Sequence, residues 1–478
     1  MNDVVIIGAG VVGASVAREL SKYDLKVTVL DKENDVSNGT TKANSAIVHG
    51  GYDPRENTLM AKYNVRGNEM YESICEELSV PFKRTGALII GSNEEDKNML
   101  EILLDRGTAN GVKGLEIICG DEALKREPNI NKNTTCALYA PSVAIVGPWE
   151  LTIALMENAV VNGVNLELNS KVTGIKKNED FYEIEVNGKK TIASKYIINA
   201  AGLYCDDMHN MVSREKQKVK AVQGEYYILD KRAGNTVSSV IFQCPTTTGK
   251  GVLVAPTVHG NLLVGPNAKT VENKDYVSNT LEGLNTVREG ALMSVPSINF
   301  RDSIRNFSGN RCYLEGISDF VIEEVKDAKG FFDIAGIKSP GLTAAPAIAE
   351  DIVKMLENSG LTLNKDANFN PIREKINFIS LSAEEKHELI KKDSSYGKMV
   401  CRCESVTEGE VIDSIRRPVG ATTITGVKKR CGAGLGRCQG GFCMPRIQEI
   451  LANELGKKLE EIVLDKEGSY ILTGQTKN

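Results

Sequence analysis

The chain has 478 residues, of which 25% are charged and 41% are hydrophobic. This composition is typical of a folded globular protein and excludes a disordered or low-complexity chain, and the length leaves room for about three domains. The 58 basic and 63 acidic side chains give a net charge of −5, which argues against a nucleic-acid-binding protein. Since the sequence contains no run of about 20 apolar residues, we expect no membrane-spanning helix.

The cysteines indicate a reducing compartment. Eleven is an odd number for a disulfide framework, and five of the cysteines crowd into residues 401–443. Such clustering is typical of metal or redox chemistry in an intracellular protein. The apolar N-terminus, residues 1–22, lacks the basic stretch of a signal peptide, and glycines interrupt its apolar run. We therefore expect the protein in the cytoplasm.

The first predicted elements form a β–α–β unit. An apolar, β-branched strand at 4–7 is followed by the glycine-rich turn 8–13, a helix at 14–22 and a second strand at 26–30. Asp31 ends the second strand, 18 residues after the last glycine of the turn. A G-x-G-x-x-G turn between a strand and a helix, with an acid at this distance, predicts a dinucleotide-binding site.

Each glycine of this turn has a separate expected role. Gly8 permits the tight turn, Gly10 lets the backbone approach a pyrophosphate, and Gly13 lets the helix pack close to the strand. The helix N-terminus offers N–H groups to the pyrophosphate, and Asp31 can accept hydrogen bonds from a ribose. The alternative is a purely structural glycine turn. The pattern leaves FAD and NAD open, although a single fingerprint and the polar, glycine-containing loop at 38–52 favour FAD.

The later segments alternate between helical and strand-like patterns. Helical patterns cover residues 149–162 and 342–358. Strand-like patterns are found at 165–176, 182–186, 195–200, 251–256, 261–266 and 331–336. Apolar residues thin out and charge rises over 364–395, which predicts a linker with one short helix at 383–391.

Three segments carry a family resemblance: the N-terminal unit, the strand end at 196–202 and the stretch at 336–346. Together they resemble the D-amino-acid-oxidase-like superfamily of FAD oxidoreductases over roughly residues 1–360. Within it, the chain is most similar to bacterial glycerol-3-phosphate dehydrogenases and L-2-hydroxyglutarate dehydrogenases. The resemblance implies an α/β fold at 1–363, in which a Rossmann-like FAD-binding domain is interleaved with an α+β substrate domain.

The same resemblance implies FAD as the cofactor and assigns residues to it. The pyrophosphate is expected at Gly8 to Gly13 and the adenosine ribose at Asp31. The other residues expected to bind FAD are Lys32, Asn44, Ser45, Gly202, Gly341, Leu342 and Thr343. Gly341 to Thr343 precede a long helix, so their N–H groups could face the flavin and stabilise the negative charge of its reduced form.

Three residues are candidates for contact with the substrate. His49 is a candidate proton acceptor for an alcohol that is oxidised by hydride transfer, and the alternative is that it holds the flavin or the backbone in place. Arg311 suits a phosphate or carboxylate, and the stretch 303–311 resembles a segment near the substrate in glycerol-3-phosphate dehydrogenases. In the same stretch, Arg305 is expected to be structural. Lys338 is a candidate for binding the substrate anion or the flavin.

The remaining histidines and the flavin-edge turn bear on the choice of substrate. His209 is expected on the surface of a helix and His259 in a hairpin turn. The Ser-Pro-Gly-Leu-Thr sequence at 339–343 is closer to the hydroxyglutarate branch. The favoured substrate is sn-glycerol 3-phosphate, which would give dihydroxyacetone phosphate. L-2-hydroxyglutarate is the close alternative, and an amino-acid dehydrogenase component is the third.

The C-terminal cysteines predict a metal centre. The expected ligands are Cys401, Cys403, Cys438 and Cys443, two close pairs in the sequence. Four thiolates in two pairs can hold two irons bridged by sulfide, and tetrahedral zinc is the competing interpretation. The stretch 437–443 resembles the bacterioferritin-associated-ferredoxin-like [2Fe-2S] domain, which implies a small helical domain at 396–478. Cys431 lies outside the pattern and is expected to be a neighbour rather than a ligand.

These observations predict an FAD dehydrogenase for a small anionic substrate. Its electrons are expected to pass from flavin to the [2Fe-2S] cluster and then to a protein or quinone-linked acceptor, which could bring the chain to a membrane surface. The alternative is a non-enzymatic electron-transfer or redox-sensing subunit. The basic side chains near the cluster, Lys428, Lys429, Arg430 and Arg437, form either a solvated face or a docking site for an acidic electron partner.

Overall fold

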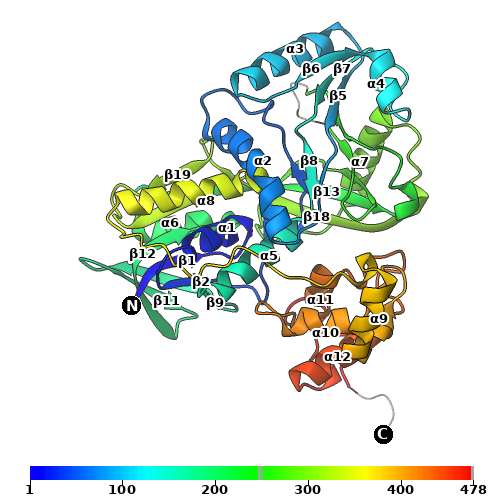
Figure 1. Cartoon of the computed structure of the whole chain (residues 1–478). Coiled ribbons are helices and arrows are strands. Elements are labelled where there is room, and N and C mark those ends of the chain that lie inside the picture. Colours follow the sequence, from blue (N-terminus) through cyan, green and yellow to red (C-terminus); the bar gives the residue numbers. More distant parts are fainter. Residues whose placement is uncertain (246–248, 250, 475–478) are drawn as a thin grey trace.

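The computed structural model describes residues 1–245, 249 and 251–474. Figure 1 shows three parts. The dinucleotide-binding lobe surrounds β1 (Asn2–Ile7) and α1 (Val11–Leu20). The substrate lobe contains β5 (Ala87–Gly91), β7 (Cys136–Ala140) and α3 (Glu94–Ala109), and a small helical C-terminal domain lies below it. In the described part of the chain, the strands form two large sheets, of eight and nine strands, and two smaller ones. None of the described helices combines the length and apolar character needed to cross a bilayer.

The dinucleotide-binding lobe is built on parallel strands. β1 (Asn2–Ile7) lies between β12 (Lys190–Asn199) and β2 (Val27–Leu30), and β20 (Phe331–Ala335) and β9 (Asn165–Glu167) extend the sheet on either side. All five strands run in the same direction. The side chains of β1 are almost all buried because both faces of a parallel sheet are covered.

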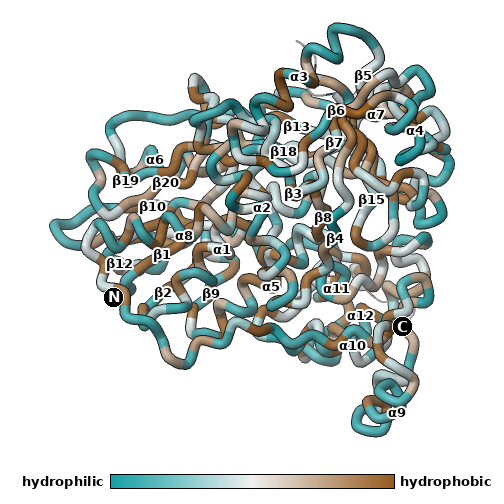
Figure 2. Tube along the Cα trace, turned by 45° about the horizontal axis from the view of Figure 1, so that its top comes forward, coloured by the Kyte–Doolittle hydropathy of each residue, from teal (hydrophilic) through white to brown (hydrophobic). Residues whose placement is uncertain are grey.

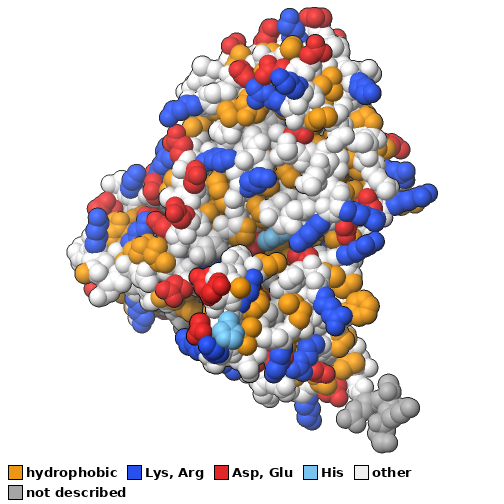
Figure 3. All heavy atoms as spheres, turned by 45° about the vertical axis from the view of Figure 1, so that its right-hand side comes forward, with side chains coloured by type: hydrophobic (Ala, Val, Ile, Leu, Met, Phe, Trp, Pro, Cys, Tyr) orange, Lys and Arg blue, Asp and Glu red, His pale blue; other side chains and the backbone are white. Residues whose placement is uncertain are grey.

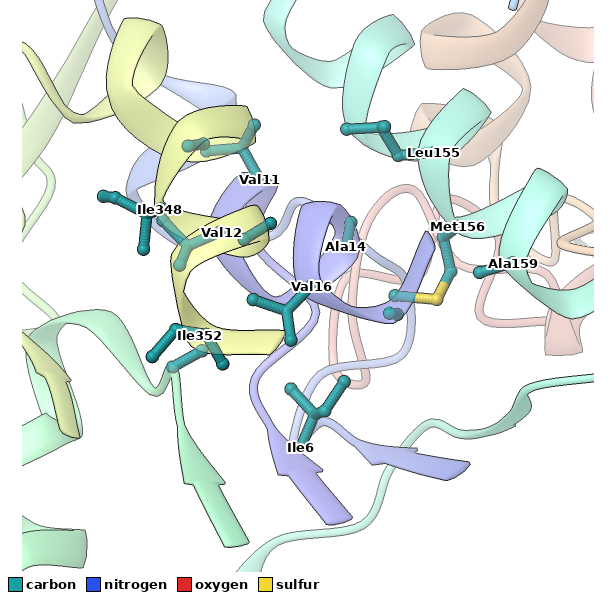
Figure 4. Packing of buried hydrophobic residues seen from close by; sticks show 14 of the residues in the cluster. Ile6, Val11, Val12, Ala14, Val16, Leu155, Met156, Ala159, Ile348 and Ile352 are labelled. Carbon is teal, nitrogen blue, oxygen red and sulfur yellow. The ribbon is translucent and has the colours of Figure 1, made fainter. Parts of the chain in front are cut away.

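Four helices pack together beside this sheet. α1 (Val11–Leu20) lies between α5 (Pro148–Val161) and α8 (Gly341–Asn358), and α2 (Leu59–Glu77) packs against α8 from the other side. Figure 4 shows the isoleucines of α8 on one side of α1 and Leu155 and Met156 of α5 on the other. The apolar contacts therefore bury α1 on nearly all sides and fix its N-terminus.

The substrate lobe is a mainly antiparallel sheet. Its longest pair is β13 (Val219–Leu229) with β18 (Ser303–Leu314), which run antiparallel over almost their whole length. The other strands of this sheet are β5 (Ala87–Gly91), β6 (Glu116–Cys119), β7 (Cys136–Ala140), β14 (Val240–Gln243), β15 (Leu253–Pro256), β16 (Leu262–Gly265) and β17 (Lys269–Val271). α3 (Glu94–Ala109) and α7 (Leu281–Ser294) pack against it.

The remaining elements of the two lobes are short. They are α4 (Gly120–Arg126), α6 (Cys205–Val212), β3 (Ile47–Val48), β4 (Phe82–Arg84), β8 (Ala144–Val146), β10 (Val172–Lys177), β11 (Tyr182–Val186) and β19 (Val321–Glu324). Figure 2 shows hydrophobic segments gathered along the strands of both sheets, whereas α9 (Ala383–Lys392) is mostly hydrophilic. The strand predicted at 165–176 is in fact two strands, because the chain turns at Asn169, where φ is +52°.

The expectation that His209 lies on the surface is wrong. This side chain of α6 is only 4% exposed, and its Nδ1 lies 2.5 Å from Oδ2 of Asp333 in the middle of β20. Its Nε2 lies 2.8 Å from the backbone oxygen of Glu215. Burial lowers the pKa of His209, but the hydrogen bond to Asp333 and the charge of that residue outweigh burial and raise it.

The C-terminal domain is a small helical unit. It contains β21 (Met399–Cys401), β22 (Val406–Thr407), α10 (Glu408–Arg416), α11 (Ile424–Cys431) and α12 (Met444–Leu455). The helices enclose a separate apolar core that includes two of the cysteines. The segment before it contains α9 (Ala383–Lys392), close to the helix predicted there.

A buried ion pair attaches this domain to the dinucleotide-binding lobe. Arg430 of α11 donates two hydrogen bonds to the carboxylate of Asp35, at 2.7 and 2.9 Å, and Lys429 Nζ lies 3.3 Å from the same carboxylate. Burial opposes ionisation of Asp35, but the two cations hold its pKa below the usual range. A second buried contact joins Arg417 to Glu157 of α5. The domain is thus held against the segment that follows β2.

Replacing Asp35 by asparagine is expected to loosen this attachment, because Lys429 and Arg430 would stay buried without a negative partner. Removing one member of a buried ion pair costs about 3–5 kcal/mol, so the first unfolding transition in scanning calorimetry should move to lower temperature. The control Glu454→Gln breaks an ion pair with Arg416, whose side chain is 67% exposed, and should change stability by about 1 kcal/mol or less. Equal effects of the two variants would contradict the role of Asp35.

Candidate functional site

The glycine-rich turn has the geometry that a dinucleotide requires. Gly8 has φ of +111°, and a Cβ there would lie 2.4 Å from the backbone oxygen of Ala200. A Cβ on Gly13 would lie 1.9 Å from the oxygen of Gly8, so α1 packs directly onto the turn. At Gly10, among the described atoms, a Cβ would approach only Thr41 Oγ1, at 3.3 Å. The turn therefore leaves space in front of the helix for a pyrophosphate.

The N-terminus of α1 and the end of β2 face the same space. Gly10 supplies no side-chain cap, and the Val11 N–H donates to Thr41 Oγ1 at 3.1 Å. Among the described contacts, the N–H groups of Val12 and Gly13 are left for an anion. Asp31 accepts hydrogen bonds from the N–H groups of Ala9 at 2.6 Å and Glu33 at 2.8 Å. Burial raises the pKa of Asp31 to about 6. Each carboxylate oxygen keeps a second lone pair, so Asp31 can still accept a bond from a ribose.

Lys32 and Gly202, which were also predicted to bind FAD, lie around the space in front of α1. Lys32 Nζ lies 3.6 Å from the centre of the Tyr204 ring and 3.9 Å from the Asp275 carboxylate. Gly202 begins the short helix that carries Tyr204, and its φ is +58°. The segments after β2, after β12 and after β17 thus meet at one edge of the dinucleotide-binding lobe.

The loop at 40–46 joins this space to the substrate lobe. Thr40 Oγ1 donates to the backbone oxygen of Asn310 in β18 at 2.8 Å. A Cβ on Gly309 would lie 2.1 Å from the oxygen of Ala43, so the loop and β18 are in direct contact. Ser45 Oγ lies 3.3 Å from Tyr226 OH of β13. Asn44 forms hydrogen bonds within the loop: its side-chain amide donates to the Thr41 backbone oxygen, and its side-chain oxygen accepts from the Ala46 N–H.

His49 is held in place through its backbone. Its N–H donates to Thr343 Oγ1 at 2.9 Å, and its carbonyl oxygen accepts from the side-chain amides of Asn64 and Asn68, both at 3.0 Å. Its Nε2 lies 3.3 Å from Ser339 Oγ. A small recess beside the ring is lined by His49, Gly51, Tyr52, Asp53, Pro54, Asn64, Ser339 and Pro340. The imidazole therefore stands in a defined place at the edge of this recess.

The start of α8 lies beside His49. The residue before the helix is Pro340, which provides no side-chain cap, and the Gly341 N–H donates to the backbone oxygen of Lys338 at 2.6 Å. Among the described contacts, the N–H groups of Leu342 and Thr343 are left for a ligand. The backbone oxygen of Leu342 accepts from the buried Tyr71 hydroxyl, and a Cβ on Gly67 of α2 would lie 2.0 Å from the oxygen of Thr343. These contacts fix the helix end. The structure thus brings Gly341 to Thr343 together with His49, as the predicted flavin site requires.

Arg311 lies on the side of the substrate sheet that faces the cofactor loop. Residues 307, 309, 311 and 313 share one face of β18, and Gly309 on that face contacts Ala43. Arg311 Nη1 lies 3.5 Å from the oxygen of Asn267. Lys338 Nζ lies 5.1 Å from the centre of the Tyr313 ring, over the same face. Both predicted anion-binding cations therefore stand on the cofactor side of the sheet.

Several residues of the site were missed by the sequence analysis. Thr41 and Ser339 act through their hydroxyl groups, and nothing in their local sequence marks them. Asn64 and Asn68 could have been noticed, because they are four residues apart on one face of α2 and that face is otherwise apolar. Both amides are almost completely buried, which a sequence pattern alone does not show.

The four C-terminal thiols form two pairs, but not the pairs of the sequence. Cys403 Sγ lies 3.8 Å from Cys438 Sγ, and the thiols of Cys401 and Cys443 are joined by a hydrogen bond. That bond lowers the pKa of Cys401 to about 6. Each pair thus takes one cysteine from each end of the domain and suits one iron of a two-iron cluster. Cys431 contacts the oxygen of Val427 at 3.3 Å, and burial raises its pKa to about 12.

Backbone N–H groups surround these thiols. Those of Phe442, Gly440 and Gly441 donate to Cys438 and lower its pKa. A Cβ on Gly436 would lie 2.3 Å from the Cβ of Cys403, so only glycine allows this close approach. Such N–H groups stabilise negative charge on cluster sulfurs. Four thiolates in two pairs fit the ligand set of a two-iron cluster.

Substitution Gly13→Ala is expected to abolish FAD binding, because the added methyl group would collide with the oxygen of Gly8 and push α1 away from the turn. The flavin absorbance of the purified protein measures this loss. Gly39→Ala is the matched control, since a Cβ there would meet no described atom within 4 Å. A Gly13 variant that keeps a full complement of flavin would contradict the proposed close approach.

Substitution Cys438→Ser is expected to lower the iron and acid-labile sulfide content strongly, because one iron loses a thiolate ligand. Cys431→Ser should leave both contents unchanged, since its sulfur contacts a backbone oxygen rather than the thiol pairs. Iron and sulfide assays on anaerobically purified protein provide the measurement. Equal losses in the two variants would show that Cys431 belongs to the ligand set.

Several known proteins are similar in sequence to this chain over most of its length. Glycerol 3-phosphate dehydrogenase of Caloramator mitchellensis is 53% identical over 100% of this chain and 99% of that protein. Glycerol 3-phosphate oxidase of Mycoplasma genitalium is 36% identical over 77% of this chain and 97% of that protein. L-2-hydroxyglutarate dehydrogenase of Arabidopsis thaliana is 28% identical over 73% of this chain and 82% of that protein.

Solved structures agree with this fold. The FAD-bound L-alpha-glycerophosphate oxidase of Mycoplasma pneumoniae superposes with a TM-score of 0.75 at 32% identity, covering 79% of this chain and 99% of that one. The glycerol-3-phosphate dehydrogenase of Bacillus halodurans shares the fold at 16% identity, with a TM-score of 0.70 over 96% of this chain and 92% of that one. The predicted fold class is confirmed.

The predicted cofactors are confirmed as well, and they are FAD and a [2Fe-2S] cluster. The glycine turn with its open space and the two thiol pairs fit these groups. The family described as FAD dependent oxidoreductase matches residues 3–355, and the BFD-like [2Fe-2S] binding domain matches residues 399–453. Because the first match spans well over half of the sequence, this chain belongs to the FAD dependent oxidoreductase family and carries a C-terminal [2Fe-2S] domain.

Proposed function

We propose that this chain is a dehydrogenase that oxidises sn-glycerol 3-phosphate to dihydroxyacetone phosphate and passes the electrons through its [2Fe-2S] domain to a downstream acceptor. The observation that carries the proposal is the fixed position of His49 beside the start of α8. The full-length similarity to a glycerol 3-phosphate dehydrogenase supports the substrate. The described cysteines are all free thiols, which supports a location in the reducing cytoplasm.

The reaction removes two electrons and two hydrogens from the substrate. The C2 hydrogen leaves with its electron pair as a hydride, and the C2 hydroxyl loses a proton. When bound, FAD supplies the hydride acceptor and the [2Fe-2S] cluster a one-electron acceptor. His49 Nε2 takes the hydroxyl proton, and the Ser339 hydroxyl 3.3 Å away can donate to Nε2 and orient the ring before the substrate arrives. The backbone bonds of His49 keep the base in position.

Arg311 and Lys338 are proposed to bind the substrate's phosphate. Both lie on the cofactor side of the substrate sheet, and an arginine can donate two parallel hydrogen bonds to phosphate oxygens. Gly224 leaves room for Arg311 to cross β13, because a Cβ there would lie 2.8 Å from Nη2. The same two cations could bind the carboxylates of L-2-hydroxyglutarate, which is therefore the alternative substrate.

Strand β18 supports the proposed electron route. Arg305 near its start lies 3.4 Å from Gln439 of the cluster loop, and Gly309 contacts Ala43 of the cofactor loop. Arg305 and Gly309 are four residues apart in β18, which corresponds to about 13 Å along the strand. The cluster loop and the cofactor loop therefore contact the same strand a few residues apart, which supports electron transfer between the two centres within one chain. Arg305 is thus a structural contact, as the sequence analysis expected.

An anaerobic substrate panel tests the function directly. The oxidised protein is mixed with sn-glycerol 3-phosphate, L-2-hydroxyglutarate and amino acids, and the flavin absorbance is followed. We expect glycerol 3-phosphate to bleach the flavin at the lowest concentration. Bleaching by L-2-hydroxyglutarate instead would reassign the substrate. Failure of every compound would favour the electron-transfer or redox-sensing subunit.

Two substitutions are expected to separate proton transfer from anion binding. His49→Asn removes the base, so kcat should fall by about 10²–10⁴-fold with little change in KM. Arg311→Gln removes a charged hydrogen-bond donor, so KM should rise by about tenfold with a smaller effect on kcat. Steady-state kinetics provide the measurement, with His387→Asn on the exposed face of α9 as the control. A His49 variant that changes only KM would show that the histidine positions the site rather than accepting the proton.

A further inference from the structure

The two thiol pairs of the cluster domain differ in exposure. Cys401 and Cys443 are buried in the apolar core of the domain, whereas Cys403 is exposed and Cys438 is half-buried. The iron held by the second pair would therefore lie nearest to the solvent. Electrons that leave the chain through a protein partner would leave from this side.

An exposed aromatic ring stands beside the exposed pair. Phe442 lies between Gly441 and Cys443 in the cluster loop, and 89% of its surface is accessible. It is the most exposed of the large apolar side chains in the described part of the chain. Single exposed apolar residues are common, but aromatic rings at interfaces often contribute most of the binding energy. The position of this ring next to a redox centre indicates a contact surface.

The exposed charge around the same pair is positive. Arg402 is exposed next to Cys403, and the side chain of Arg437 is 69% exposed next to Cys438. The nearby acids are covered: Glu404 is 12% exposed and bonded to Lys231, and Asp230 is 13% exposed beside Arg437.

Two further cations meet behind the loop, where Arg305 and Lys428 each lie 3.4 Å from the Gln439 side-chain oxygen. Figure 3 shows Lys and Arg side chains gathered along the right-hand edge of the molecule, where the substrate lobe meets the C-terminal domain. A partner that approaches the exposed thiol pair therefore meets cations and an aromatic ring but few exposed acids.

We propose that Arg402, Cys403, Arg437 and Phe442 form an acceptor face on which a small acidic electron-carrier protein docks. The proposal rests on the proposed function, in which electrons leave through the cluster. Complementary charge would steer an acidic carrier to this face and repel a basic one, and Phe442 would anchor it. The carrier's own redox group would then lie beside the iron held by Cys403 and Cys438.

The test uses the full-length holoprotein and does not depend on the substrate. The protein is reduced by light with a deazaflavin and mixed anaerobically with the soluble domain of cytochrome b5, an acidic carrier, or with cytochrome c, a basic one. In the double variant Arg402→Glu/Arg437→Glu we expect cytochrome b5 reduction to slow by about tenfold or more and cytochrome c reduction to accelerate. The wild-type rate with cytochrome b5 should fall steeply as salt is raised.

Controls separate docking from damage to the cluster. Lys392→Glu/Lys457→Glu makes the same change of charge at exposed positions in α9 and after α12, and should leave both rates unchanged. Phe442→Ser should slow cytochrome b5 reduction at every salt concentration, because the lost contact is apolar. The iron content and the electron paramagnetic resonance signal of the reduced cluster should match the wild type in each variant.

Two results would overturn the acceptor face. One is an unchanged rate with cytochrome b5 in both the arginine and the phenylalanine variants. The other is rapid reduction of a neutral, water-soluble quinone by all variants together with negligible reduction of either cytochrome, which would assign the acceptor to the quinone class. Because the electrons come from light, a failed substrate panel would count against the proposed dehydrogenase and not against this face.

Discussion

The close approach of α1 to the end of β1 is the contact on which the site depends. Only hydrogen atoms at positions 8 and 13 let the helix and the turn come so near. Because of that approach, the N-terminus of α1 points into the space where the pyrophosphate is expected. Packing against α5 and α8 buries the helix and holds it in this position. A nucleotide bound there would extend toward the start of α8, where a second uncapped helix N-terminus and His49 stand together.

The [2Fe-2S] domain is attached to the lobe that binds the nucleotide. Asp35 follows β2 by a few residues, and its buried bonds to Arg430 and Lys429 tie α11 to the segment between Asp31 and the cofactor loop. A buried ion pair adds little net stability, yet it permits only one arrangement of the two parts, because any other would leave a charge buried without a partner. The relative position of the two redox sites therefore follows from electrostatics as much as from apolar packing.

The substrate lobe completes this arrangement through one strand. β18 contacts the cluster loop near its start and the cofactor loop in its middle, and it carries Arg311 toward its end. A single rigid strand thus sets the distances among cluster, flavin space and anion-binding group. The Cys403–Cys438 pair is the more exposed of the two thiol pairs, whereas Cys401 and Cys443 belong to the apolar core of the domain.

The sequence by itself determined the features that depend on near neighbours. Two local patterns predicted the two cofactors: the spacing of Gly8, Gly10 and Gly13, and the four clustered cysteines. Each pattern depends only on residues that lie close together in the sequence. Only the tertiary structure decided the rest. It paired each cysteine with a partner from the opposite end of the domain, buried His209 against Asp333, and joined Asp35 to Arg430 across 395 positions. Such contacts depend on how distant segments pack, and neither hydrophobic periodicity nor local propensity predicts which segments will be in contact.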